Sequence, residues 1–529
     1  MTNSRSQTEP CPHCHISGPG SSIISDEVLA QCLRRRKDVC VACQKLADVE
    51  RKIEETRRTL DILLKEKQAL VSTLNDHHDL LSRQLPVEIA SQIFLQSLLH
   101  QPEDLMRNRY YMEEPFIKSV FLPGQVSKHW RNIAEGTPKM WSVISVTINR
   151  NNCFDTVAFT REWLELSGDF LLYIQLRIVW PTTTVDKVFS SLSEKILALL
   201  IQHARRWKVI DFDVPNDFLP WISNTLLNHH LDRLEHVKLD ETSARSPHLL
   251  ANGVLGLQAS PHRLTLGDLG VQLRQIAINM EHLTHFTSNS AIEMDECIKL
   301  FQVASRLSHC NLWRGVEGHI SSDILVNCPS LHTLNFVECS SNWWKYFIFP
   351  SLETLSVYDL SDVSWMRLYD FLQRTGCKVK KLHVTHNNDG SMPDMLDILK
   401  LTPDLQQLKL LGGVLQEPFF SLMDAAASST TSFLKNLTSL ILILDDENFD
   451  WTWLLVFLTT VMTRPEKSLR YFKFVYPSGL SLEVRFEGGT LHNRRTFKLL
   501  LCVLEDVELE LVDGTNTDLV KLLRHCHNI

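Results

Sequence analysis

A short apolar pattern recurs along most of the chain and restricts its fold more than any other feature. Apolar residues occupy the first, fourth and sixth positions of a unit, as in Leu331-x-x-Leu334-x-Phe336. The units begin at Trp207, Leu234, Leu307, Leu331, Leu352, Val379, Leu405, Leu437, Leu469 and Leu504. In a strand the fourth and sixth positions face the same side, so each unit predicts one strand with a single apolar face.

The pattern is typical of the strands of leucine-rich repeats. From Leu307 onward the units begin 21 to 35 residues apart, which indicates connecting segments of irregular length. A proline stands two residues before the unit at Pro329, Pro350 and Pro403, where a strand tolerates it. We therefore predict an α/β fold overall, with an irregular leucine-rich-repeat solenoid over residues 145–529; an unrelated α/β domain is the alternative.

A heptad pattern precedes the repeats. Apolar residues from Leu46 to Leu81 alternate in steps of three and four, without a glycine or proline between them. This spacing predicts a long amphipathic helix, assigned to a coiled-coil region at 44–84. Its apolar seam can be covered by its own chain or by a second chain in a coiled coil, and polar Lys67 and His77 lie on that seam.

Two short segments between the long helix and the repeats are richer in apolar residues than a small core requires. In the segment Leu85–Leu98, Pro86 suits the first position of a helix, and Ile89 and Ile93 form an i,i+4 pair. The second segment predicts a helix that presents one apolar face and ends at Gly136 and Pro138; its face comprises Val126, Trp130, Ile133 and Ala134. The excess apolar surface indicates that a partner covers part of it.

These two segments, "LPVEIASQIF" and "VSKHWRNIAEGTPKMW", resemble an F-box over residues 85–144. The F-box pattern opens with Leu-Pro and closes with Val, Trp-Arg and a final Trp. Pro86 and Trp130 are 44 residues apart, some dozen more than is usual for the family. We expect the extra residues in a polar loop, "HQPEDLMRNRYYMEEP", between the first two of three helices.

The resemblance implies a docking role without chemistry. F-box proteins bind a Skp-type adaptor, which joins them to the cullin core of an SCF ubiquitin ligase, and capture a protein substrate with their C-terminal domain. The positions matching the family's adaptor-binding residues are Leu85, Pro86, Ile89, Ile93 and Val126. Trp130, Ile133 and Trp141 match positions that build the F-box core or its edge, and all eight are predicted partner-binding residues. Substrate is expected on the concave strand face, with candidates His332, Thr333, Glu353, Lys380, Lys381, Gln406 and Gln407.

The N-terminal residues 1–43 are polar and carry two Cys-x-x-Cys pairs. These four thiols, Cys11, Cys14, Cys40 and Cys43, have the pairing that tetrahedral zinc uses, but the 25 residues between the pairs exceed the common spacing. The basic run Arg34–Lys37 is typical of a solvated helix face, of an import signal or of phosphate contacts. We leave zinc open and predict no metal or cofactor.

Composition narrows the function further. The net charge of −8 argues against nucleic acid as the main partner, and no apolar run is long enough to span a membrane. There is no P-loop, His-Glu-x-x-His or Gly-x-Ser-x-Gly pattern, so we predict no catalytic residue. A polar N-terminus predicts a cytoplasmic or nuclear protein. Two alternatives to a ligase subunit stay open: a ligase-independent repeat scaffold and a zinc-dependent regulatory protein.

Overall fold

The fold is described from a computed structural model of the chain. Placement is described for residues 41–78, 85–98, 114–149, 153–179, 187–215, 218–240, 255–267, 273–313, 316–317, 324–337, 343–360, 362–386, 392–412, 415, 417–429, 433–444, 451–463, 468–475 and 499–512. The chain divides into two compact units. Unit 1 comprises residues 1–101 and 114–137, and unit 2 comprises residues 102–113 and 138–529.

Unit 1 is helical in its described part. The long helix predicted from the heptads is confirmed as α2, Val41–His78, and it is followed by α4, Val87–Ser97, α5, Glu114–Val126, and α6, Lys128–Glu135. The middle helix, α5, has no clear sequence pattern and contains Pro123. The loop expected between the first two helices spans residues 100–115; residues 100–113 lie outside the described part, and Glu114 and Pro115 begin α5.

A small core joins α4 to α6. Phe94 of α4 is buried and its ring lies 5.1 Å from that of Trp130 in α6. The Thr137 hydroxyl donates to the Ile133 carbonyl oxygen at 2.6 Å and lies 2.8 Å from the Ser91 hydroxyl. Arg131 of α6 donates from Nε and Nη2 to the carbonyl oxygen of Gly124 in α5, at 3.0 and 2.8 Å. Side-chain packing and these polar contacts together hold the three helices as one body.

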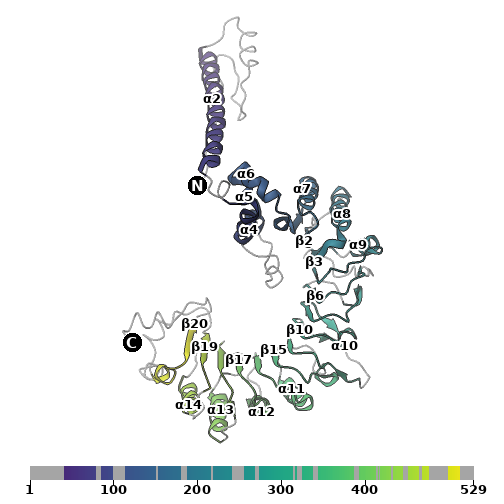
Figure 1. The fold of residues 1–529 in the computed structure, drawn as a ribbon. Coiled ribbons are helices and arrows are strands. Elements are labelled where there is room, and N and C mark those ends of the chain that lie inside the picture. The colour runs from purple at the N-terminus through teal and green to yellow at the C-terminus, as the bar shows by residue number, and fades with distance from the viewer. Residues whose placement is uncertain are drawn as a thin grey trace. The chain divides into compact units, whose positions relative to one another are not determined.

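Unit 2 contains a 14-stranded parallel sheet whose strands follow one another in chain order (Figure 1). Its strands are β1 Val143–Ile148, β2 Leu172–Ile178, β3 Trp207–Asp213, β4 His236–Asp240, β6 Arg263–Leu266, β8 His285–Ser288, β10 His309–Leu312, β13 Thr333–Val337, β15 Thr354–Leu360, β16 Lys381–His386, β17 Gln407–Gly412, β18 Ser439–Ile443, β19 Tyr471–Val475 and β20 Glu508–Val512. Nine of the ten units that we recognised align with these strands as predicted. The unit assigned to Leu504 is displaced by two residues, because register pairs Phe472 with Leu509 and Phe474 with Leu511. The predicted α/β class is confirmed.

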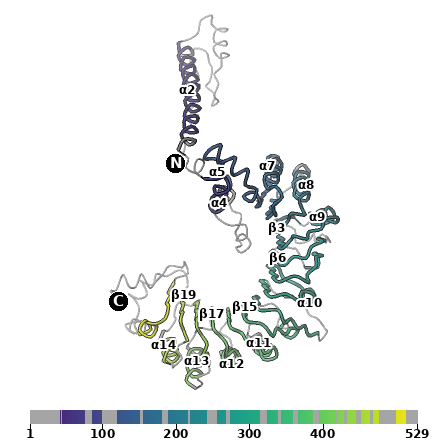
Figure 2. The backbone as a smooth tube through the Cα atoms, viewed as in Figure 1, coloured from purple at the N-terminus to yellow at the C-terminus, as the bar shows by residue number. Residues whose placement is uncertain are grey.

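Helices cover one face of this sheet and leave the other open (Figures 1 and 2). They are α7 Cys153–Leu166, α8 Lys187–Gln202, α9 Leu219–Leu226, α10 Met294–Val303, α11 Asp362–Thr375, α12 Met392–Leu401, α13 Glu417–Ser429 and α14 Trp451–Met462. Short 3-10 turns occur at Pro138–Trp141, Ala204–Arg206, Leu273–Gln275 and Trp343–Tyr346. Three two-stranded parallel sheets form between β5 Leu255–Gly256 and β7 Ile276–Ala277, β9 Ile292–Glu293 and β11 Val316–Glu317, and β12 Val326–Asn327 and β14 Phe347–Ile348.

The fourth and sixth positions of the strand units form two columns on the covered face, which are apolar except at buried Ser288 of β8. Register pairs Leu334 with Leu355, and Leu355 with Leu382, and all three side chains are fully buried. Alternate strand residues are half-exposed, as expected when one face is packed and the other is open. Burial of these columns against the helices drives the stacking of the strands.

The N-terminal edge of unit 2 differs from the predicted boundary at 145. Trp141, assigned by sequence to the end of the F-box, belongs to unit 2 and stands three residues before Ile144, the fourth position of the first strand unit. Its ring lies 5.5 Å from that of Trp163 in α7, and the Trp163 indole N–H donates to the Trp141 carbonyl oxygen at 2.8 Å. Trp141 therefore packs as the first apolar position of a strand unit.

An aromatic cluster fills the covered side between β13 and α11. The Trp344 ring lies 4.5 Å from Phe336, 5.2 Å from Trp343 and 4.8 Å from Phe371 between ring centroids. Edge-on and tilted aromatic pairs at such distances add to the stability that area burial provides. Trp344 thus connects a strand, a 3-10 turn and a helix in one packed site.

Replacing Trp344 by alanine is therefore expected to lower the free energy of unfolding by about 3–5 kcal/mol, since it removes a large buried side chain. The measurement is urea denaturation followed by far-ultraviolet circular dichroism. Met366→Ala in α11 is the control, because Met366 is 66% exposed, and it should change stability by less than about 0.5 kcal/mol. Equal effects of the two substitutions would contradict this packing.

Candidate functional site

The first candidate site is the outer face of α4. Pro86 precedes the helix rather than beginning it, and its carbonyl oxygen accepts the backbone N–H groups of Ile89 and Ala90 at 3.0 and 3.1 Å. One face of α4 is buried through Ala90, Phe94 and Leu95. The opposite face is also apolar, and its exposed side chains are Leu85, Val87, Ile89 and Ile93. A helix with apolar residues on both faces has more apolar surface than its own core uses.

The end of α5 contributes further exposed apolar residues, Leu122 and Val126. Val126 was predicted on the same helix as Trp130, but it is the last residue of α5, and Ser127 begins a new helix. The Ser127 hydroxyl accepts the backbone N–H of Trp130 at 3.1 Å, which caps the free donors of the first turn of α6. This cap separates Val126 from the Trp130 face.

The eight sequence-predicted partner-binding residues thus fall into two groups. Five are exposed in unit 1: Leu85, Pro86, Ile89, Ile93 and Val126. Trp130 is half-buried and Ile133 is only 4% exposed, both within the unit 1 core, whereas Trp141 is buried in unit 2. Val87 and Leu122 were not predicted from the sequence as exposed apolar residues of this site. Their position in short segments rich in apolar residues could have indicated it.

The second candidate site is the open strand face of unit 2. Its side chains form columns, because register aligns Thr333 with Thr354, Thr354 with Lys381 and Lys381 with Gln407. Of the substrate-facing candidates, Thr333, Lys381 and Gln407 lie in this column. The others, His332, Glu353, Lys380 and Gln406, immediately precede it at the beginning of their strands.

Polar ladders connect neighbouring strands near both ends of this face. At the β3 end, Lys238 contacts Asp211 at 2.8 Å and Arg177 contacts Asp213 at 2.9 Å. At the β20 end, Lys473 contacts Glu510 at 2.8 Å. In the middle, Asn335 donates to Asn311 at 2.6 Å, and Asn311 to Thr287 at 3.1 Å. These ladders satisfy polar side chains that the single layer of helices leaves uncovered.

One column of the open face contains three histidines, His236, His285 and His309. Arg263 lies between the first two of them. Burial, followed by the charges of Arg263, Lys238 and His285, lowers the pKa of His236 to about 4. Burial, followed by Arg263 and His309, lowers the pKa of His285 to about 4. Both imidazoles are therefore neutral at physiological pH in the free chain.

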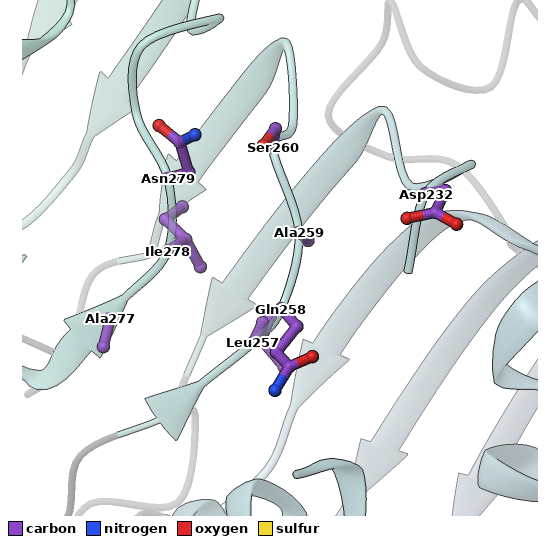
Figure 3. A pocket seen from close by; sticks show the side chains of 8 residues that line it. All are labelled: Asp232, Leu257, Gln258, Ala259, Ser260, Ala277, Ile278 and Asn279. Atoms are coloured by element: carbon purple, nitrogen blue, oxygen red, sulfur yellow. The ribbon is translucent and has the colours of Figure 1, made fainter. Parts of the chain in front are cut away.

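A small open hollow of about 510 Å³ lies among the segments that precede β4, β6 and β8 (Figure 3). It is lined by Asp232, Leu257, Gln258, Ala259, Ser260, Ala277, Ile278 and Asn279. Asp232 is the one ionisable residue of this lining, and Ser260 has no lining base to activate it. The hollow lacks the paired groups that hydrolytic or acid–base chemistry requires.

Within the described ranges, no group of three or more His, Cys, Asp or Glu side chains could hold a metal ion. The proposed zinc thiols Cys11, Cys14 and Cys40 lie outside those ranges, as do Arg34–Lys37, and Cys43 is placed only by its backbone in α2. Searching the same ranges finds no helix with the length and apolar character needed to cross a membrane. No protein-family model matches the chain, and no curated protein matches it.

The neutral state of His236 predicts a pH effect on stability. The unfolded chain takes up a proton near the ordinary pKa of 6.5, whereas the folded chain takes it up only near 4. The contribution of His236 is therefore present above pH 6.5 and is lost as the pH falls toward 4. The urea midpoint of His236→Gln should fall less between pH 7 and pH 5 than that of the wild type. His262→Gln, at an exposed position before β6, should keep the wild-type slope.

Proposed function

We propose that this chain is a non-catalytic, substrate-recognition subunit of an SCF-type ubiquitin ligase. Helices α4, α5 and α6 would act as an F-box that docks on a Skp-type adaptor. Unit 2 would act as a leucine-rich-repeat solenoid that holds a protein substrate on its open strand face. The protein would work in the cytoplasm, the nucleus or both, and long helix α2 offers an additional coiled-coil contact.

One observation carries the docking proposal. Side chains at the Leu-Pro opening and on the outer face of α4 are exposed although they are apolar, while the opposite face of the same helix is fully buried. Leu85 is 38% exposed, Ile89 47% and Ile93 40%. An adaptor that covers these residues would complete a core of which unit 1 builds only half.

The energy available from these side chains is one part of what specific binding requires. Fully burying a large aliphatic side chain contributes about 1.5–3 kcal/mol, so a half-exposed one gains roughly 1 kcal/mol. Leu85, Val87, Ile89, Ile93 and Val126 together would then contribute roughly 5 kcal/mol before the entropy lost on association. Removing two of them should weaken the complex by roughly tenfold or more.

The solenoid proposal is supported by the order and register of the strands in unit 2. Stacked leucine-rich repeats form parallel strands in chain order, with apolar columns on one face. The strands of unit 2 have this arrangement and are joined by segments of irregular length. The ligase would then act by tethering. A substrate held beside the ligase core has a high effective concentration for ubiquitin transfer, so the chain itself supplies no nucleophile.

The test is co-purification of the full chain with a recombinant Skp-type adaptor. The wild type should bind it, and Leu85→Ala/Pro86→Ala should weaken binding, because both residues are exposed at the start of α4. Ile89→Ala/Ile93→Ala should weaken binding by roughly tenfold or more. The readout is the dissociation constant from calorimetry, with circular dichroism to verify that the variants are folded.

Leu227→Ala is the matched control, since Leu227 is an exposed aliphatic residue of unit 2, next to α9. It should bind the adaptor like the wild type. A wild-type chain that does not bind the adaptor, or α4 variants that bind unchanged, would favour the ligase-independent scaffold instead.

A further inference from the structure

The middle of the open strand face is basic, although the chain as a whole is acidic. From β6 to β18, the two neighbouring columns of open-face side chains contain no carboxylate among the residues that register places there. The chain as a whole carries a net charge of −8. Six members of these columns are basic or imidazole side chains: Arg263, His285, His309, Lys381, His383 and Lys409.

These six side chains form two clusters separated by neutral strands. Arg263, His285 and His309 lie on the adjacent strands β6, β8 and β10. Lys381, His383 and Lys409 lie on the adjacent strands β16 and β17. The strands between them, β13 and β15, present the hydrogen-bonding side chains Thr333, Asn335 and Thr354, whereas Ser356 is buried beside His383.

The permanent cations of the two clusters are not neutralised within the described part of the chain. Arg263, Lys381 and Lys409 have no carboxylate partner there, although Lys238 and Lys473, toward the ends of the same face, each pair with one. The nearest such pair, Lys380 with Glu353 at 2.7 Å, immediately precedes the columns. An uncompensated charge on a half-buried face is a ready partner for an external anion.

The histidines of the two clusters would add positive charge only when an anion is bound beside them. The rings of His285 and His309 stack in parallel, 4.3 Å apart at 4°, and their Nδ1 atoms lie 2.9 Å from the hydroxyls of Thr284 and Ser308. Burial, then His332 and Arg263, lowers the pKa of His309. Burial, then Lys409 and Lys381, lowers the pKa of His383 to about 4. A bound anion would offset these repulsions and favour proton uptake.

We infer that the open strand face from β6 to β17 binds an extended protein segment bearing clustered anionic side chains, which are phosphorylated residues or runs of carboxylates. This rests on the proposed function, in that the segment belongs to the substrate. Six strand steps of about 4.8 Å separate β6 from β17, so a segment of roughly nine extended residues would cross both clusters. Strands β13 and β15 would form hydrogen bonds with the central residues of this segment.

A protein segment suits the face better than a nucleic acid does. Three permanent cations over about 29 Å match a few separate anionic side chains, whereas a nucleic acid places a phosphate at every nucleotide. The two columns also carry no Trp, Tyr or Phe side chain on β6 to β17, and the stacked rings of His285 and His309 already cover each other.

The experiment measures fluorescence polarisation of labelled peptides with the full chain. Three peptides of about twelve residues share one backbone sequence and carry, at the same positions, phosphoserine, glutamate or serine. The anionic peptides should bind at least roughly tenfold more tightly than the serine peptide, and less tightly as salt rises. The phosphoserine and glutamate arms distinguish the two sources of anionic oxygen. Equal binding of all three would overturn the inference.

Charge removal tests the clusters separately. Arg263→Gln and Lys381→Gln/Lys409→Gln should each weaken the anionic peptides by roughly tenfold. Lys299→Gln on α10 is the matched control, because Lys299 is exposed and α10 lies on the helical side of the sheet; it should bind like the wild type. Unchanged binding by both cluster variants would overturn the inference, as would tighter, Arg263-dependent binding of a single-stranded RNA.

The glutamate peptide also tests the histidines, since its side chains do not titrate near pH 6 as phosphoserine does. Its affinity should increase from pH 7.5 to pH 6, and His285→Gln should reduce that increase. Arg263, His309 and Thr284 surround His285, while Lys381, Lys409 and Ser356 surround His383. An affinity that is the same at both pH values would overturn the role of the imidazoles.

Adaptor binding, measured on the same preparations, separates this inference from the proposed function. A chain that binds the adaptor but no anionic peptide refutes only the strand-face inference. A chain that binds anionic peptides through Arg263 but no adaptor refutes only the ligase assignment.

Discussion

Burial of two apolar columns against a single layer of helices is the interaction on which the rest of unit 2 depends. No strand unit can bury its fourth and sixth positions by itself, so each needs the strand before it, the strand after it and a helix or turn above it. Leu334, Leu355 and Leu382 illustrate this, since each is fully buried only because its neighbours extend the column. Helices on one face leave the opposite face open. Polar ladders lie on that open face, together with Arg263, Lys381 and Lys409, which have no carboxylate partner among the described residues.

Unit 1 has a different relation between core and surface. Helices α4, α5 and α6 are too short to surround a large core, so they bury Phe94 and Ile133 and leave an apolar face on α4 exposed. Such a face is stabilised only when something else covers it. This shortage of core is the physical basis of the docking role that we propose for unit 1.

Much of this architecture could be predicted from sequence. The strand units from Leu307 onward were recognised because their first, fourth and sixth positions are apolar, and the heptads predicted α2. Strands β6 and β8 were missed because Pro261 stands at the first position of one unit and Ser288 at the sixth of the other. Without them, the alignment of Arg263 with His285 and His309 could not be seen. Sequence also placed Trp141 in the wrong unit, because a tryptophan that ends one motif can equally begin the next.

The amino-acid sequence alone determined the α/β class, the long helix and the positions of most strands, because these follow from local periodicity. Tertiary structure decided which side chains share a surface, because register, not sequence distance, sets the neighbours of a strand residue. It separated exposed Ile89 and Ile93 from buried Ile133, and it gathered distant Arg263, His285 and His309 into one cluster. Such clusters depend on pairings between residues more than twenty positions apart, which no local pattern encodes.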